Sequence, residues 1–209
     1  MTLHVVPPGG VTTMTPARRL KNILGGSAGN FVEWFDWFAY SAFAIYFSRA
    51  FFPAGDQTAQ LLGAAAIFAV GFIARPLGAL LFGRYADRAG RRTALTLSVA
   101  MMCGGSLMIA LIPTGLGVLS PALLLVARLL QGLSVGGEYG ASATYISEMA
   151  ERTQRGFWSG FLYVTLTGGQ LAALLLLVLL QRVLTEPQLY AWGWRIPFAV
   201  GAALAVIVW

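Results

Sequence analysis

Six apolar stretches, each close to the length that crosses a lipid bilayer, alternate with short polar segments along the chain. A hydrocarbon core of about 30 Å requires about 20 predominantly apolar residues in helical conformation. Because lipid offers no hydrogen-bond partner to the backbone, each stretch is expected to be a helix. The sequence therefore predicts an all-α, polytopic membrane protein with six transmembrane helices. We expect these helices near Ile23–Phe47, Gln60–Phe82, Thr93–Ile112, Pro121–Tyr145, Phe157–Gln181 and Gly193–Trp209.

The composition supports a protein embedded in a lipid bilayer and excludes several other classes. Of the 209 residues, 57% are hydrophobic and 11% are charged, which is too few charges to coat a water-soluble domain of this size. The net charge of +6 comes from short basic clusters between the apolar stretches, and these form no continuous face for nucleic acid. His4 is the single histidine and Cys103 the single cysteine, so we expect no disulfide, no metal site and no cofactor.

The two ends of the chain differ from its middle. Residues 1–20 contain several prolines and glycines and no continuous apolar segment, so we expect a disordered cytoplasmic tail and no secretory signal. Residues 21–209 are expected to form one transmembrane domain. Its last apolar stretch has 16 residues from Trp194 onward, fewer than a full span needs. We therefore expect this domain to be the N-terminal half of a larger protein whose C-terminal half is absent.

The distribution of basic residues predicts the orientation of the helices. With a cytoplasmic N-terminus, nine lysines and arginines lie in cytoplasmic segments, while Arg49, Arg182 and Arg195 lie in external ones. Cytoplasmic loops retain Lys and Arg preferentially. We therefore expect the N-terminus to be cytoplasmic.

Charged residues within the first expected helix are the main indication of function, because a charge at mid-bilayer costs about 3 kcal/mol or more. Asn30, Glu33, Asp36 and Tyr40 follow a helical spacing that places them on one face, away from lipid. A proton-titrating carboxylate or part of a solute path is one interpretation. A pair of structural carboxylates bonded to neighbouring helices is the other.

The fourth expected helix carries a polar stripe and, on an adjacent face, three glycines spaced by four residues. Such a polar stripe lines a cavity or a helix interface, and the glycines allow another backbone to approach closely. Arg128, at the outer end of the stripe, is placed to pair either with a substrate carboxylate or with Glu33 or Asp36. The stripe contains Gln131, Ser134, Glu138, Ser142 and Tyr145, and the glycines are Gly132, Gly136 and Gly140.

Arg75 precedes Pro76 near the expected inner end of the second helix. Its side chain is expected either to extend to the membrane interface or to contribute to a solute site. The connector that follows, Gly83–Arg92, is too short to form a domain. Its glycines permit tight turns, and one aspartate among arginines suggests a charge network that changes as helices move. The residues of this expected network are Gly83, Asp87, Gly90, Arg91 and Arg92.

Two of these segments resemble signatures of the major facilitator superfamily. Gly83–Arg92 is similar to its G-x-x-x-D-x-x-G-R-[RK] loop, and Arg128–Gly132 is similar to its fourth-helix R-x-x-Q-G motif. The segments Gly29–Asp36, Arg75–Gly78 and Gln131–Gly140 resemble the metabolite:H+ symporter branch of that superfamily. The resemblance implies a transporter of two six-helix halves, with a solute site near the midplane between them and alternating access by rocking.

The resemblance also implies symport of an organic dicarboxylate with protons across a bacterial inner membrane. Candidate substrate contacts are Arg128, Arg75, Arg195, Gln131 and Tyr145, and candidate proton-coupling carboxylates are Glu33, Asp36 and Glu138. The same fold also carries citrate, shikimate, proline or betaine, and a non-transporting fragment is a further alternative. An enzyme is not expected, because no nucleophile–base pair or metal-ligand cluster can be assembled from these residues.

Overall fold

The computed structural model describes residues 16–52, 55–149 and 155–208, and for some helical residues in these ranges it describes the backbone alone. All regular structure in these ranges is helical. The elements are α1 (Pro16–Phe51), α2 (Gln57–Ala89), α3 (Arg91–Leu111), α4 (Leu119–Met149), α5 (Arg155–Val183), α6 (Glu186–Ala191), the 3₁₀ helix η1 (Gly193–Arg195) and α7 (Ile196–Val208).

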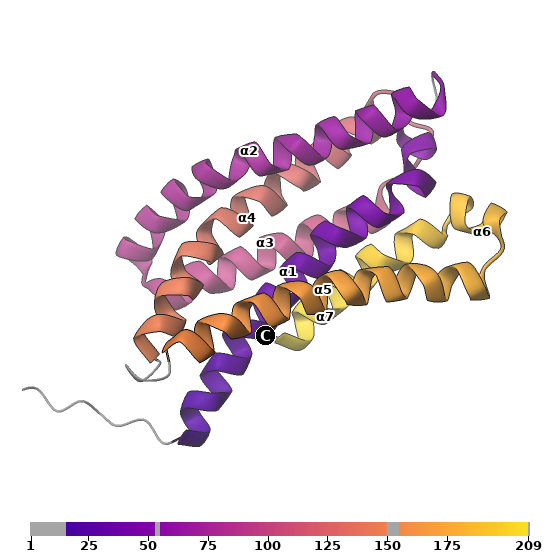
Figure 1. Cartoon of the computed structure of the whole chain (residues 1–209). Helices are drawn as coiled ribbons and strands as arrows, with labels where there is room; N and C mark the ends of the chain where they lie inside the picture. Colours follow the sequence, from indigo (N-terminus) through magenta and orange to yellow (C-terminus); the bar gives the residue numbers. More distant parts are fainter. Residues whose placement is uncertain (1–15, 53–54, 150–154, 209) are drawn as a thin grey trace, which may run out of the picture.

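The long helices pack side by side in a bundle (Figure 1). The most extensive contacts join α2 to α4 and α1 to α5, while α3 contacts both α4 and α7. α1 also contacts α2, α4 and α7. This central helix therefore brings its buried side chains within reach of most of the others.

Several helices combine the length and the apolar surface that a bilayer requires. By length and composition, three segments of the described chain are able to cross a membrane: α2, Leu119–Gly137 of α4 and Tyr163–Val183 of α5. Thr96–Leu111 of α3 is a shorter apolar helix. Large apolar side chains lie on the outer surface of α2, where Ile73 is 70% exposed. In water such a surface would promote aggregation, whereas lipid solvates it.

Glycines bring α2 and α4 unusually close together. A Cβ added to Gly132 would overlap the carbonyl oxygen of Gly71, and one added to Gly136 would overlap the carbonyl oxygen of Arg75. Small residues at such a crossing allow direct backbone contact and extensive van der Waals packing. The packing role expected for these two glycines is therefore confirmed.

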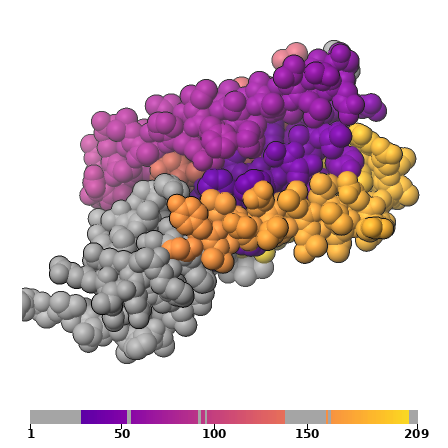
Figure 2. All heavy atoms as spheres, in the orientation of Figure 1, coloured from indigo at the N-terminus to yellow at the C-terminus, as the bar shows by residue number. Residues whose placement is uncertain are grey.

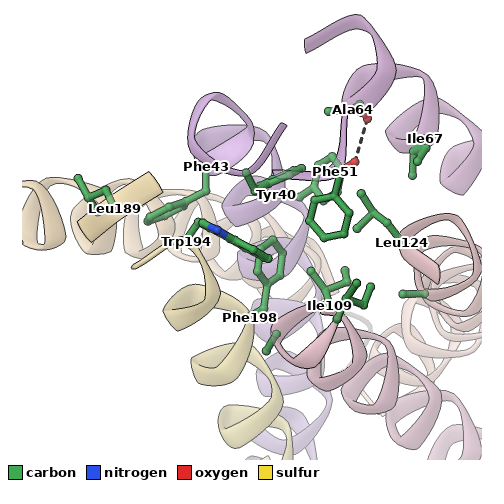
Figure 3. Close-up of a cluster of buried hydrophobic side chains, with 14 of the residues drawn as sticks. Tyr40, Phe43, Phe51, Ala64, Ile67, Ile109, Leu124, Leu189, Trp194 and Phe198 are labelled. Carbon is green, nitrogen blue, oxygen red and sulfur yellow. Dashed lines mark hydrogen bonds between the residues drawn. The ribbon is translucent and has the colours of Figure 1, made fainter. Parts of the chain in front are cut away.

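Aromatic side chains from α1, η1 and α7 fill the core near the end of the bundle where α1 ends (Figure 3). Phe51 and Trp194 pack edge to face with ring centroids 5.5 Å apart, and Phe198 reaches the ring of Tyr40. The Tyr40 hydroxyl donates a hydrogen bond of 2.9 Å to the carbonyl oxygen of Ala64 on α2. This core fixes α1 against its neighbours directly beside the polar residues described below.

The first helix is longer than the sequence indicated. α1 begins at Pro16 and not at Ile23, so residues 16–20, which were expected to belong to the tail, are helical. Proline suits the first helical turn, where the backbone N–H would lack an intrahelical partner in any case. Residues 1–15 of the expected tail lie outside the described chain.

The expectation of a turn at Gly83 is wrong. α2 continues through Gly83 to Ala89, and α3 begins at Arg91. A single glycine costs a helix about 1 kcal/mol, which the surrounding intrahelical hydrogen bonds override. The turn is made at Gly90 alone, whose φ of +89° lies in the region that favours glycine.

The chain also forms a short element that the sequence did not reveal. α6 begins after Thr185, which forms a capping box with Gln188 at the first turn. The 3₁₀ helix η1 then leads into α7, which begins at Ile196 and not at Gly193 as expected. This arrangement places the indole of Trp194 in the core, with 0% exposure.

Candidate functional site

The polar residues predicted to share one face of α1 do lie together inside the bundle. Asn30, Glu33, Asp36 and Tyr40 are each no more than 6% exposed. At the N-terminal end of this row, the Asn30 amide donates a hydrogen bond of 2.7 Å to the hydroxyl of Thr165 on α5. The α1 face is therefore a protein interface, away from lipid.

Asp36 forms the centre of a polar network between α1, α3 and α4. Its Oδ2 accepts hydrogen bonds from Arg128 Nη1 at 3.0 Å and from Gln131 Nε2 at 2.9 Å. Its Oδ1 accepts one from the hydroxyl of Ser106 at 2.5 Å. Arg128 Nη1 also donates to Gln131 Oε1 at 2.6 Å, while Arg128 Nε and Nη2 have no hydrogen-bond partner in the described chain.

Aromatic rings cover the guanidinium of Arg128. Its central carbon lies 3.7 Å from the ring centroid of Tyr40 and 4.8 Å from that of Trp37, with Phe68 slightly farther away at 5.6 Å. A cation over an aromatic face is favourable, by about 2 kcal/mol when the cation is desolvated. The rings therefore exclude water from this ion pair while they still stabilise its cation.

The side chains of Arg128 and Asp36 are both 0% exposed. Desolvation of such a pair costs free energy, and loss of one partner's charge leaves the other uncompensated. Protonation of Asp36 would therefore change the electrostatic balance of the whole helix interface. The sequence left open whether Arg128 pairs with a substrate, with Glu33 or with Asp36, and in this structure its partner is Asp36.

Arg75 forms a second, more open cationic centre. Its guanidinium lies over the rings of Phe72, at 3.9 Å, and Trp37, at 4.3 Å, so the side chain packs over aromatic rings and does not extend along the helix. Glu33 interacts with it electrostatically. The nitrogens Nε and Nη2 are buried and have no hydrogen-bond partner in the described chain. The chemistry of these donors suits an oxyanion.

Trp37 connects the two cationic centres. Both Arg75 and Arg128 lie over its ring, and the ring itself is only 2% exposed. The two guanidiniums are also near enough for their charges to interact. The site is therefore one aromatic and electrostatic unit built from α1, α2 and α4.

Arg195 is not brought together with this unit. Its Nη2 donates a hydrogen bond of 2.9 Å to the carbonyl oxygen of Ile112, at the C-terminal end of α3, and its guanidinium stacks on Trp194. Burial lowers the pKa of Arg195 below the usual arginine value, although a guanidinium remains protonated at physiological pH. A cation at a helix C-terminus also complements the helix dipole.

Only some of the remaining residues expected at the site and in the loop network have side chains that the structure describes. The side chains of Glu138, Tyr145, Arg91 and Arg92 lie outside the described part of the chain. Asp87 lies on the exposed last turn of α2, beside the junction at Gly90. Within the described residues no group of acidic, His or Cys side chains is suited to hold a metal.

Ser106 and Trp37 are parts of the site that the sequence did not reveal. Ser106 lies in the apolar α3 segment, and Trp37 is one of several aromatics in α1. A hydroxyl in an apolar span was the one available signal for Ser106, because buried polar groups require partners. Nothing in the sequence distinguished Trp37 from its aromatic neighbours.

Comparisons with known proteins find relatives that match most of the chain. Residues 23–209 match the sugar (and other) transporter family. The chain is 55% identical to the alpha-ketoglutarate permease of Escherichia coli over 199 residues, which are 94% of this chain and 46% of that protein. It is 39% identical to the citrate-proton symporter of Salmonella typhi over 188 residues, which are 89% of this chain and 43% of that protein.

A solved structure with a similar fold is the inward-open xylose transporter XylE from E. coli. The TM-score is 0.79 at 20% identity, over 91% of this chain and 46% of that one. The fold class expected from the sequence, an all-α six-helix membrane domain, is confirmed. The chain spans about half the length of the curated relatives it matches.

Proposed function

We propose that the intact protein is a proton-coupled symporter, because this chain belongs to the sugar (and other) transporter family of the major facilitator superfamily. It takes up α-ketoglutarate or a related dicarboxylate across the bacterial inner membrane by alternating access. The members named above are transporters and not enzymes. The 55% identity to an alpha-ketoglutarate permease supports this substrate over others.

The enclosed Asp36–Arg128 pair is the observation that supports proton coupling. A carboxylate held at 3.0 Å from a guanidinium, with both groups fully buried between helices, is costly to maintain for stability alone. Intramembrane ionisable groups of this kind mark proton relays and solute paths. A proton that arrives at this network has a direct electrostatic effect on how α1 and α4 pack.

The proposed site residues follow from this geometry. Arg75 and Arg128 supply the positive charge, and Gln131 orients the network. Glu33, Asp36 and Glu138 are the candidate proton carriers. We also propose Tyr145 as a substrate contact from its position on α4, and we assign Arg195 a positioning role at the end of α3.

The rest of the solute cavity is proposed to come from a second six-helix half, because the chain matches 46% of the permease and 43% of the citrate symporter. The loop network of Gly83, Asp87, Gly90, Arg91 and Arg92 would contact that half as the two rock. We place the N-terminus in the cytoplasm on the basis of loop charge. A reporter enzyme that is active only in the periplasm is therefore expected to be inactive when it is fused in the loop after α2 or in the loop after α4.

Membrane vesicles bearing the full-length protein test the function. With an inward proton gradient they are expected to accumulate labelled α-ketoglutarate, and a protonophore is expected to abolish accumulation. Arg128→Lys keeps the charge but loses the planar fork, so uptake should fall at least tenfold. Arg182→Lys, on the exposed end of α5, is the matched control. Uptake that is unchanged by the protonophore would contradict the coupling.

Citrate is the second candidate substrate, because a citrate-proton symporter is 39% identical to the chain. Competition discriminates between the two. Unlabelled α-ketoglutarate should inhibit uptake at lower concentration than citrate, shikimate, proline or betaine. The reverse order would assign the protein to another substrate on the same fold.

A further inference from the structure

The two cationic centres differ in how far their charge is already satisfied. Asp36 and Arg128 are both enclosed, and the Asp36 carboxylate accepts hydrogen bonds from three donors. In both arginines Nε and Nη2 have no hydrogen-bond partner in the described chain, but Arg75 is partly exposed whereas Arg128 is 0% exposed. An incoming carboxylate therefore reaches Arg75 more readily than Arg128, which is enclosed and already paired with Asp36.

The surroundings of Arg75 are suited to a carboxylate. The rings of Phe72 and Trp37 hold the guanidinium in place and shield its faces. Its free donors lie in the plane of the fork, where a carboxylate forms two parallel hydrogen bonds. Unpartnered buried donors are unfavourable, so an oxyanion that reaches them removes an existing cost.

Arg75 is the more accessible of the two arginines, because it is partly exposed while Arg128 is 0% exposed. On the face shown in Figure 2, α1 lies at the bottom of a furrow between α2 and α5. Phe72, which stacks on Arg75, is 38% exposed. The Arg75 centre is therefore closer to solvent than the Arg128 centre, which is covered by rings.

Glu33 is the acidic group that acts on Arg75 in the present structure. It is 2% exposed and lies three residues before Asp36, on the same helical face. The other charged groups that face this region in the described chain are Arg128 on α4 and Asp36 on α1 itself. The side chain of Glu138 lies outside that description. A substrate carboxylate at Arg75 would meet the negative charge of Glu33 directly, and two like charges at one site disfavour the ionised form of at least one.

We propose that Arg75 is the subsite for a substrate carboxylate and that Glu33 is its counter-ion in the substrate-free state. The substrate carboxylate displaces Glu33 from Arg75, and Glu33 takes up one proton from solvent as it becomes neutral. The inference rests on the proposed function, because it assigns the coupling proton of that transport to one of the three candidate carboxylates.

Proton uptake on binding is the direct test. Full-length protein in lipid nanodiscs is titrated with α-ketoglutarate by calorimetry at pH 7.5 in two buffers of different ionisation enthalpy, which counts protons bound per substrate. The wild type is expected to take up about one proton, and its affinity should fall about tenfold per pH unit as pH rises. Glu33→Gln is expected to take up none and to bind independently of pH. Glu186→Gln, an exposed glutamate on α6, is the matched control and should behave as wild type.

A second pair of measurements tests the exchange itself. Arg75→Lys should bind at least tenfold more weakly, because an ammonium cannot reproduce the bidentate fork. Infrared difference spectra on α-ketoglutarate addition should show a new protonated-carboxyl band in the wild type that Glu33→Gln lacks. A Glu33→Gln protein that takes up the same proton, or wild-type affinity in Arg75→Lys, would overturn the inference and leave symport intact. A wild type that binds no α-ketoglutarate would instead refute the proposed function.

Discussion

Replacement of Asp36 by asparagine is the sharpest test of the buried network. Asp36→Asn keeps the shape of the side chain but removes the charge that neutralises Arg128, which is 0% exposed. Asparagine also has one oxygen where aspartate has two, so the three donors that Asp36 satisfies would compete for it. We expect Asp36→Asn to lower the free energy of unfolding.

The magnitude follows from the burial of both partners. Removal of one member of a buried ion pair costs about 3–5 kcal/mol, because the remaining charge is left uncompensated. In Asp36→Asn, Arg128 retains Gln131 Oε1 and the covering rings, which places the expected loss near the lower end, at about 3 kcal/mol. Removal of both charges relieves this cost. Asp36→Asn/Arg128→Met should therefore be more stable than Asp36→Asn alone, by about 2 kcal/mol.

The assay is an SDS titration of the full-length protein in mixed micelles, followed by tryptophan fluorescence. Wild type, both single variants and the double variant form a double-mutant cycle. Arg182→Gln, at the exposed end of α5, is the control and should change stability by no more than about 0.5 kcal/mol. If the losses from Asp36→Asn and Arg128→Met add up in the double variant, the two residues do not interact and the reasoning fails.

Two further stability predictions concern helix packing and a helix end. Gly132→Ala places a methyl group against the carbonyl oxygen of Gly71 and should lower the free energy of unfolding by about 1–3 kcal/mol in the same titration. The control, Gly104→Ala, meets open space and should leave stability unchanged or raise it. Equal effects of the two variants would contradict close α2–α4 packing. Arg195→Gln removes the hydrogen bond to Ile112 and should cost about 1 kcal/mol, and an unchanged midpoint would show that this bond is dispensable.

The periodicity of α1 was sufficient to predict which of its residues are buried together. Glu33, Asp36 and Tyr40 share a face because the helical repeat alone fixes their relative directions. The glycine spacing of α4 likewise predicted close backbone contact, and Gly132 and Gly136 make it with α2. Both predictions concern one helix at a time, and that is why sequence sufficed.

Which residues contact each other between helices could not be predicted from the sequence. Asp36 and Arg128 are separated by 92 positions, so their pairing depends on how α1 and α4 rotate against each other. Glu33 lies one turn away on the same face and was an equally good candidate partner. The prediction of a turn at Gly83 was wrong for a related reason. Glycine permits a turn, but whether a helix ends there depends on the hydrogen bonds and packing around it.

The separation of the two arginines has an electrostatic consequence for a dicarboxylate. Glu33, Asp36, Arg75 and Arg128 have a summed charge near zero, and Trp37 lies against both guanidiniums. A dianion gains little from a neutral cluster in a medium of low dielectric constant. In the proposed exchange, protonation of Glu33 gives the same cluster a net positive charge centred on Arg75, which would attract the substrate. Coupling of substrate to proton in this proposed exchange requires no long-range relay, because the substrate carboxylate and ionised Glu33 compete for the same guanidinium.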